Sequence, residues 1–168
     1  MKSVVIALLV SLLSATLANA QNQQPESFRK LPPDIAGFLD KKYPGWKFAP
    51  LTGRDVSCYD TDVKAHPALA SGDFNADGKT DFAVEIVHGG SIYAIEFLSK
   101  GSSFATLVLF KRPDGKRFGG PLVAEKKGKK NSVGMVEPVD SLAVGDCGDV
   151  PARYVFRNGR IKDESPRD

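Results

Sequence analysis

Short apolar segments that alternate with polar residues, each cut off by turn residues, fill most of this sequence. Residues 92–98 and 104–110 have the period of two that is typical of a strand with one buried face. Turn signals follow at residues 113–115, Pro-Asp-Gly, and at residues 158–159, Asn-Gly. Successive short strands joined by tight turns favour a mostly antiparallel sheet.

A helix is expected before the strands. Pro32 and Pro33 suit its first turn, and from Ile35 onwards apolar residues recur at i, i+3 and i+4. The helix should end near Lys42, because a Pro-Gly pair follows. The expected fold class is therefore α+β: an N-terminal helix followed by a mostly antiparallel β-meander, in a single domain over residues 32–168.

Residues 1–20 have the pattern of a secretory signal peptide. Lys2 is the only charge, an apolar run covers residues 4–13, and the stretch ends in Ala-Asn-Ala at Ala20. The run is shorter than the ~20 residues that a membrane-spanning helix needs, although a retained membrane anchor is the alternative. We expect cleavage after Ala20, a periplasmic or extracellular protein with no membrane span after cleavage, and a flexible segment at residues 21–31.

The two cysteines, Cys58 and Cys147, both follow the predicted cleavage site. In an oxidising compartment the simplest expectation for two cysteines is a disulfide. Closing a loop of about 90 residues would stabilise the fold by roughly 4–5 kcal/mol in the chain-entropy model. Two separate buried thiols are the alternative. The formal net charge of +3 is too balanced to indicate a nucleic-acid partner.

The most specific motif is an acidic loop, residues 73–81, with the sequence Asp-Phe-Asn-Ala-Asp-Gly-Lys-Thr-Asp. Side-chain oxygens fall at its positions 1, 3, 5 and 9, and position 7 offers a backbone carbonyl; these are Asp73, Asn75, Asp77, Asp81 and Lys79. Calcium takes about six to eight oxygen ligands, and alternate side chains of a tight loop can surround one ion. The glycine at position 6 permits the sharp turn.

Position 12 of the acidic loop distinguishes two kinds of calcium site. A helix–loop–helix site has a bidentate Glu there, whereas this sequence has Val84. Glu85 comes one residue late and would point to the opposite face of a strand. The run at residues 82–87 is strand-like, so we expect a calcium loop that leads into a strand.

Residues 72–84, Gly-Asp-Phe-Asn-Ala-Asp-Gly-Lys-Thr-Asp-Phe-Ala-Val, resemble the calcium loop of FG-GAP/VCBS-type repeats, which occur in integrin α-subunit propellers and in many bacterial secreted proteins. The resemblance implies calcium binding through the side chains of Asp73, Asn75, Asp77 and Asp81 and the carbonyl of Lys79. It does not imply a propeller, because the sequence holds a single copy of the loop. A turn rich in Asp, Asn and Gly that binds no metal is the alternative.

Three weaker motifs each have more than one interpretation. Residues 126–130, Lys-Lys-Gly-Lys-Lys, could meet an anionic surface or form a solvated hairpin tip. The His-Gly-Gly sequence at residues 88–90 is similar to an esterase oxyanion loop, but no Gly-x-Ser-x-Gly elbow accompanies it, which favours a turn. Asp60 and Asp62 could line the calcium site, serve as paired carboxylates for glycoside hydrolysis, or simply be solvated.

These patterns predict an exported, calcium-binding, non-enzymatic module whose partner is an extracellular protein or an anionic polysaccharide. No catalytic residue is assigned. A secreted hydrolase that uses Asp or Glu side chains is one alternative function. An inhibitor of a foreign hydrolase such as lysozyme is another, and it rests on size and compartment.

Overall fold

The computed structural model describes residues 31–50, 57–59, 61–113, 120–130, 134–145, 147, 151–157 and 160–165. The predicted signal peptide, almost all of the predicted flexible segment, Asp60 and the Asn-Gly turn at residues 158–159 lie outside the described residues. Within these ranges the helices are α2 (Pro33–Lys42) and α3 (Thr61–Ala65). The strands are β1 (Lys47–Phe48), β2 (Leu69–Gly72), β3 (Asp81–His88), β4 (Ser91–Lys100), β5 (Ser103–Pro113), β6 (Leu122–Glu125), β7 (Ser141–Val144), β8 (Ala152–Arg157) and β9 (Arg160–Asp163).

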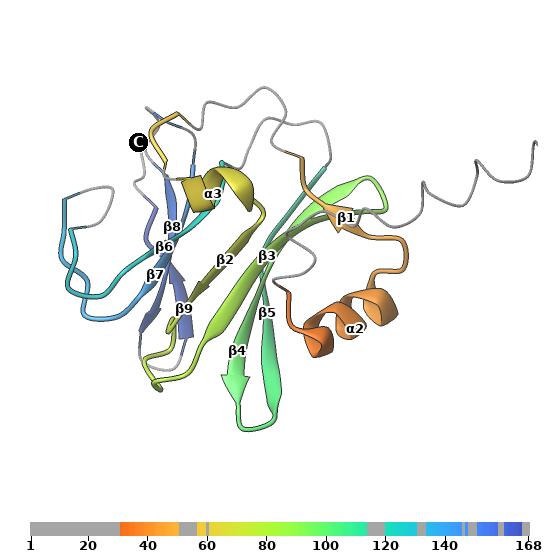
Figure 1. The fold of residues 1–168 in the computed structure, drawn as a ribbon, viewed down its shortest axis with the longest axis horizontal. Helices are drawn as coiled ribbons and strands as arrows, with labels where there is room; N and C mark the ends of the chain where they lie inside the picture. The colour runs from red at the N-terminus through yellow and green to blue at the C-terminus, as the bar shows by residue number, and fades with distance from the viewer. Residues whose placement is uncertain are drawn as a thin grey trace, which may run out of the picture.

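Every pairing between these strands is antiparallel, as the turn signals predicted, but the strands form two sheets rather than one. The first sheet has the order β1-β3-β4-β5, with β2 also paired to β3, and the second has the order β6-β7-β8-β9. Strand β2 pairs with residues 81–84 of β3 and β1 pairs with residues 86–87, since each of these two strands is shorter than β3. The two sheets and α2 give three layers, with the first sheet in the middle (Figure 1).

Helix α2 covers one face of the first sheet. Pro33 stands at its first turn, where a missing N–H is tolerated, and Asp34 lies beside the positive end of the helix dipole. Ile35 and Leu39 are fully buried against a cluster that includes Val84 from β3 and Phe97 from β4. Burial of each such side chain contributes about 1.5–3 kcal/mol.

The other face of the first sheet packs against the second sheet. Ala83 and Leu98 from the first sheet meet Leu142 and Tyr154 from the second in one buried cluster. Phe74, from the acidic loop, is 1% exposed and belongs to the same cluster. The acidic loop is therefore fixed to the core between the sheets by its own second residue.

Buried carboxylates also face this core. Glu85 and Glu96 are 2% and 1% exposed and lie two residues from Ala83 and Leu98 along their strands, so they point toward the second sheet. Burial, and then the nearby charge of Asp81, raise the pKa of Glu96 to about 8. Burial thus favours the neutral form of Glu96 in the folded protein relative to an exposed Glu.

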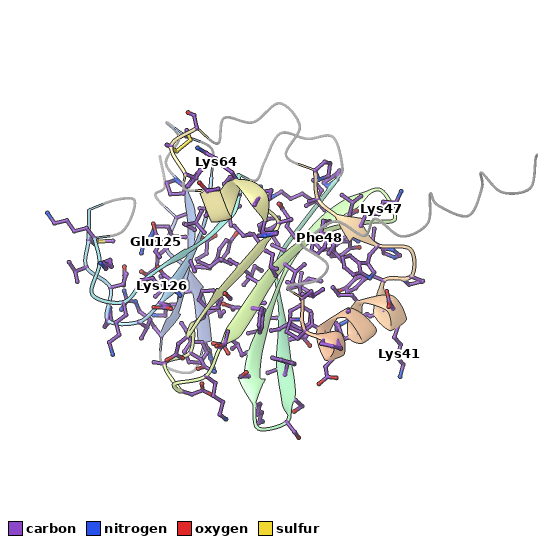
Figure 2. All side chains as sticks on the ribbon, viewed as in Figure 1. Lys41, Lys47, Phe48, Lys64, Glu125 and Lys126 are labelled. Carbon is purple, nitrogen blue, oxygen red and sulfur yellow. A yellow bond between two sulfur atoms is a disulfide. The ribbon has the colours of Figure 1, made fainter. Side chains whose placement is uncertain are left out.

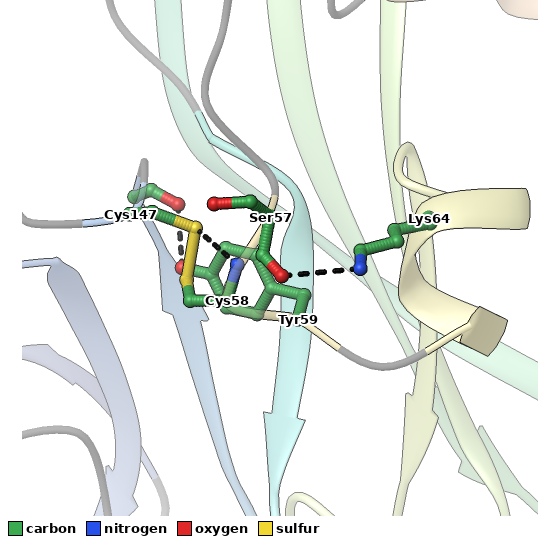
Figure 3. The surroundings of a disulfide bond; sticks show 6 residues. Ser57, Cys58, Tyr59, Lys64 and Cys147 are labelled. Carbon is green, nitrogen blue, oxygen red and sulfur yellow. Dashed lines mark hydrogen bonds between the residues drawn. A yellow bond between two sulfur atoms is a disulfide. The ribbon is translucent and has the colours of Figure 1, made fainter.

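The predicted disulfide between Cys58 and Cys147 is present, and Figure 3 shows its surroundings. It ties the segment before α3 to the segment after β7. The hydroxyl of Tyr59 donates a hydrogen bond of 2.7 Å to the carbonyl of Gly145, and Lys64 Nζ donates one of 3.1 Å to the carbonyl of Ser57. No helix among the described residues is both long and apolar enough to cross a membrane.

Candidate functional site

The acidic loop joins two neighbouring antiparallel strands of the first sheet. Gly72 ends β2, Asp81 begins β3, and the two residues are register partners. The element after the loop is a strand, as predicted, rather than the second helix of a helix–loop–helix site. Ala76 and Gly78 adopt positive φ angles of 61° and 81°, which bend the chain sharply within the loop.

Hydrogen bonds from backbone N–H groups to side chains hold the acidic loop together. The Asp73 carboxylate accepts two bonds of 3.0 Å, from the N–H groups of Asp77 and Gly78. Asn75 Oδ1 accepts from the N–H of Asp77 at 2.9 Å, and Asp77 Oδ1 accepts from the N–H of Lys79 at 2.9 Å. Such bonds from Asx side chains to the backbone stabilise turns without any ligand.

Asp81 has a different position from the other acidic residues, because it is completely buried. Its Oδ2 accepts bonds of 2.9 and 3.2 Å from the N–H groups of Phe74 and Asn75, and its Oδ1 accepts one of 2.7 Å from the N–H of Ser99. Burial raises the pKa of Asp81, and these N–H donors partly offset that rise. Asp81 thus anchors the loop to β4 as well as closing it.

The chemistry of the loop's donors suits calcium, whereas their placement is only partly that of a metal site. Asp73, Asn75 and Asp77 supply hard oxygen atoms on an exposed loop, and a carboxylate oxygen can accept more than one interaction. Asp81 turns both of its oxygens toward backbone N–H groups. Across the described residues, no three His, Cys, Asp or Glu side chains form a group that could hold a metal ion.

Asp140 connects the acidic loop to the second sheet, and nothing in the sequence pattern indicated it. Its Oδ2 accepts a 3.0 Å bond from the N–H of Asp73, and its Oδ1 accepts a 2.8 Å bond from the N–H of Lys127. Lys126 Nζ lies 3.0 Å from the same carboxylate. Burial alone would raise the pKa of Asp140, but these donors and the lysine charge together lower it.

The basic segment, residues 126–130, begins where β6 ends, and Figure 2 labels Glu125 and Lys126 at this point. All five of its residues are exposed. Two backbone bonds of 3.0 Å shape it: Lys129 donates to the carbonyl of Lys126, and Gly128 donates to the carbonyl of Glu137. An antiparallel bridge pairs Lys130 with Val136. Within the described part of the chain, the side chains of Lys127, Lys129 and Lys130 form no ion pair.

A buried ion-pair network joins residues that precede and follow the basic segment in the chain. Arg153 of β8 is completely buried and pairs with Glu137 at 2.6 Å and with Glu125 at 3.2 Å. Glu137 also accepts a 3.0 Å bond from Arg157. A buried arginine that contacts two carboxylates fixes the ends of β6 and of the segment before β7 relative to β8.

The remaining sequence candidates are the His-Gly-Gly motif and the two aspartates Asp60 and Asp62. The His-Gly-Gly motif forms the tight turn between β3 and β4. The ring of His88 packs edge-on against the ring of Tyr43, with 5.6 Å between the ring centroids. The side chain of Asp62 lies outside the described residues, as does Asp60. Each of three described cavities is lined by at most one carboxylate, Asp34 or Asp163, so none of the three supplies the residue pair of a glycoside hydrolase.

Comparisons with protein-family models, with curated proteins and with solved structures find no family, relative or structural neighbour that matches this chain.

Proposed function

We propose that this chain is an exported module that binds an anionic polysaccharide through the basic segment, and that calcium at the acidic loop stabilises it. The carboxylate of Asp140 carries the proposal, because it accepts hydrogen bonds both from Asp73, at the start of the acidic loop, and from Lys127, in the basic segment. An ordered acidic loop would therefore help to fix the backbone of the basic segment, because both are bonded to the buried side chain of Asp140.

The basic segment supports the binding role through its charge and its anchoring. Four lysines lie within five residues, and all four are exposed. Asp140 and the carbonyl of Glu137 hold the backbone beneath them, so less conformational entropy is lost when a ligand binds. Flexible lysine heads act as point charges, which suit a repeating polyanion better than one shaped pocket.

The acidic loop supports the stabilising role. Asp73, Asn75, Asp77 and Asp81, with the carbonyl of Lys79, would hold a calcium ion there. Bound calcium would neutralise the mutual repulsion of the three aspartates. The chain itself supplies the remaining order, through the core contacts of Phe74 and the hydrogen bonds that Asp81 accepts.

The test of the binding role compares two charge reversals. Wild type should bind immobilised heparin and not neutral dextran, and binding should weaken as salt rises. Lys129→Glu should weaken heparin binding about tenfold or more, whereas Lys162→Glu, the same change at an exposed position of β9, should have a much smaller effect. Equal effects of the two variants, or no heparin binding by wild type, would refute the proposed polysaccharide role.

The hydrolase and inhibitor functions remain alternatives with their own readouts. Release of reducing sugar from a polysaccharide would favour the hydrolase. Protection of bacterial cells from lysozyme in a lysis assay would favour the inhibitor.

A further inference from the structure

The basic segment belongs to a lobe beside the second sheet. The lobe comprises the described residues 126–130 and 134–137, and an antiparallel bridge between Lys130 and Val136 joins its two stretches. The N–H of Gly128 donates a 3.0 Å hydrogen bond to the carbonyl of Glu137, which joins them a second time. Figure 1 shows both stretches extending outward from the second sheet, on the side away from α2. The lobe is therefore a projecting part of the surface that a large partner can reach.

Two large apolar side chains of the lobe are exposed. Met135 is 50% exposed and its neighbour Val136 is 60% exposed. Only two other large apolar side chains of the described residues are exposed, Leu107 and Val108 of β5. Exposed apolar side chains that lie together, rather than singly, are typical of surfaces that meet a partner or a membrane.

Positive charge lies directly beside the apolar side chains of the lobe. Directly opposed residues of antiparallel strands point to the same face with their Cβ atoms about 4.5–5.5 Å apart, and Lys130 is opposed to Val136 in this way. Among the described residues of the lobe Glu137 is the only carboxylate, and it is 3% exposed and paired with Arg153. The described surface of the lobe therefore combines lysine charge with apolar side chains and exposes no negative charge.

The apolar side chains distinguish between two carriers of negative charge. A soluble polysaccharide is polar, so contact with it would give Met135 and Val136 no apolar environment. At a membrane surface, by contrast, side chains that pass the head groups by about 5–10 Å reach the boundary of the acyl chains. Stable membrane binding usually needs two contributions, and a basic patch with apolar insertion supplies both.

We infer that the anionic polysaccharide bound by the basic segment is linked to a membrane lipid, and that Met135 and Val136 enter the apolar layer from which it extends. This inference rests on the proposed binding role, because it assigns the same lysines to the polyanion. The methylene stem of a lysine is apolar, so Lys130 can lie along Val136 and still place its ammonium group among the anionic groups.

Cosedimentation with lipid vesicles tests the apolar contact, using the predicted mature chain, which lacks the apolar run at residues 4–13. Wild type should bind phosphatidylcholine vesicles that contain lipopolysaccharide, an anionic glycolipid, and should not bind vesicles of phosphatidylcholine alone. The double variant Met135→Ser/Val136→Ser should bind the glycolipid vesicles about tenfold more weakly and keep its binding to heparin. The matched control Leu107→Ser/Val108→Ser, at the exposed apolar pair of β5, should change neither.

A second measurement applies if the double serine variant does not fold. A polarity-sensitive fluorophore on Val136→Cys should shift its emission to shorter wavelength when glycolipid vesicles are added, whereas the same label on Val108→Cys should not. The two native cysteines are paired with each other, so the label reacts only at the new thiol.

The results separate this inference from the proposed function. Equal vesicle binding by wild type and the Met135→Ser/Val136→Ser variant, an equal loss in the β5 control, or no emission shift at Val136→Cys would overturn lipid insertion. So would a wild type that binds heparin but not the glycolipid vesicles, and each of these results would leave the binding role intact. Failure of wild type to bind heparin would instead refute the proposed function itself.

Discussion

The backbone N–H of Asp73 donates a 3.0 Å hydrogen bond to Oδ2 of Asp140, which lies 67 residues later in the chain. Asp73 opens the acidic loop beside the first sheet, and Asp140 immediately precedes β7 of the second sheet. Because Asp140 also accepts the N–H of Lys127, one carboxylate joins the loop, the second sheet and the basic segment.

Asp140→Ala should destabilise the protein by about 1–3 kcal/mol, because it leaves the N–H groups of Asp73 and Lys127 without their acceptor. Urea unfolding at pH 7 measures the difference from wild type. The pKa of Asp140 is lowered in the folded protein, so its stabilisation is present above the unfolded pKa of about 3.9. It is lost as pH falls through the folded value, and the difference from wild type should shrink on acidification. A difference that grows in acid would contradict the assignment.

Gly72→Ala should destabilise the protein, because an added Cβ would lie 2.8 Å from Asp140 Oδ2 and 2.9 Å from Phe74 Cε1. We expect a loss of about 1–3 kcal/mol from overpacking. Gly37→Ala is the matched control: its Cβ meets no atom within 4 Å, and alanine stabilises a helix interior by about 0.5–1 kcal/mol relative to glycine. Thermal unfolding of both variants should therefore give shifts of opposite sign. An unchanged or raised unfolding temperature for Gly72→Ala would show that Gly72 has room for a side chain.

The local elements of this fold could be predicted from the sequence, whereas the long-range contacts could not. The antiparallel strands follow from apolar alternation and turn residues, and the strand after the acidic loop follows from Val84 at position 12. The division into two sheets was missed because strand alternation does not state which strands pair. Both faces of β3 are buried, but its sequence does not indicate this. Glu85 has the charge expected of a solvent-facing strand residue, although it is only 2% exposed.

Only the local part of the candidate site could be predicted from the sequence, because residue spacing shows local structure and not long-range contacts. The spacing of the acidic loop is a local property, so all five of its candidate residues could be named in advance. Asp140 is an isolated acidic residue in the sequence, and its role depends on the packing of one sheet against the other. Arg153 likewise resembles an exposed strand residue, and only the positions of Glu125 and Glu137 account for its complete burial.

Glu96→Gln should flatten the dependence of stability on pH. The folded pKa of Glu96 is raised to about 8, whereas an unfolded Glu titrates near 4.3. Between about pH 4.3 and pH 8 the unfolded chain releases this proton and the folded chain keeps it. Stability therefore falls as pH rises through that range, by at most about 1.4 kcal/mol per pH unit from this group. Glutamine cannot ionise, so urea midpoints at pH 5 and pH 8 should differ less in the variant. An unchanged difference would mean that Glu96 is ionised in the fold.

Glu137→Gln should destabilise the protein by about 3 kcal/mol, because Arg153 is fully buried and loses the charge of its nearest partner. Glu164→Gln provides the control, since the Arg157–Glu164 pair is 36% and 29% exposed and contributes at most about 1 kcal/mol. Denaturant unfolding of both variants at pH 7 measures the difference between them. If the two losses are equal, the buried network does not fix β6 and β8 as described.

Calcium addition to the chelator-treated protein, followed by thermal unfolding, tests the central claim most directly. Wild type should unfold at a higher temperature, since free calcium at about ten times Kd adds about 1.4 kcal/mol of stability. Asp77→Ala should lose this increment, whereas Asp34→Ala, at an exposed aspartate of α2, should keep it. Equal increments in wild type and Asp77→Ala, or none in wild type, would contradict calcium binding at the acidic loop.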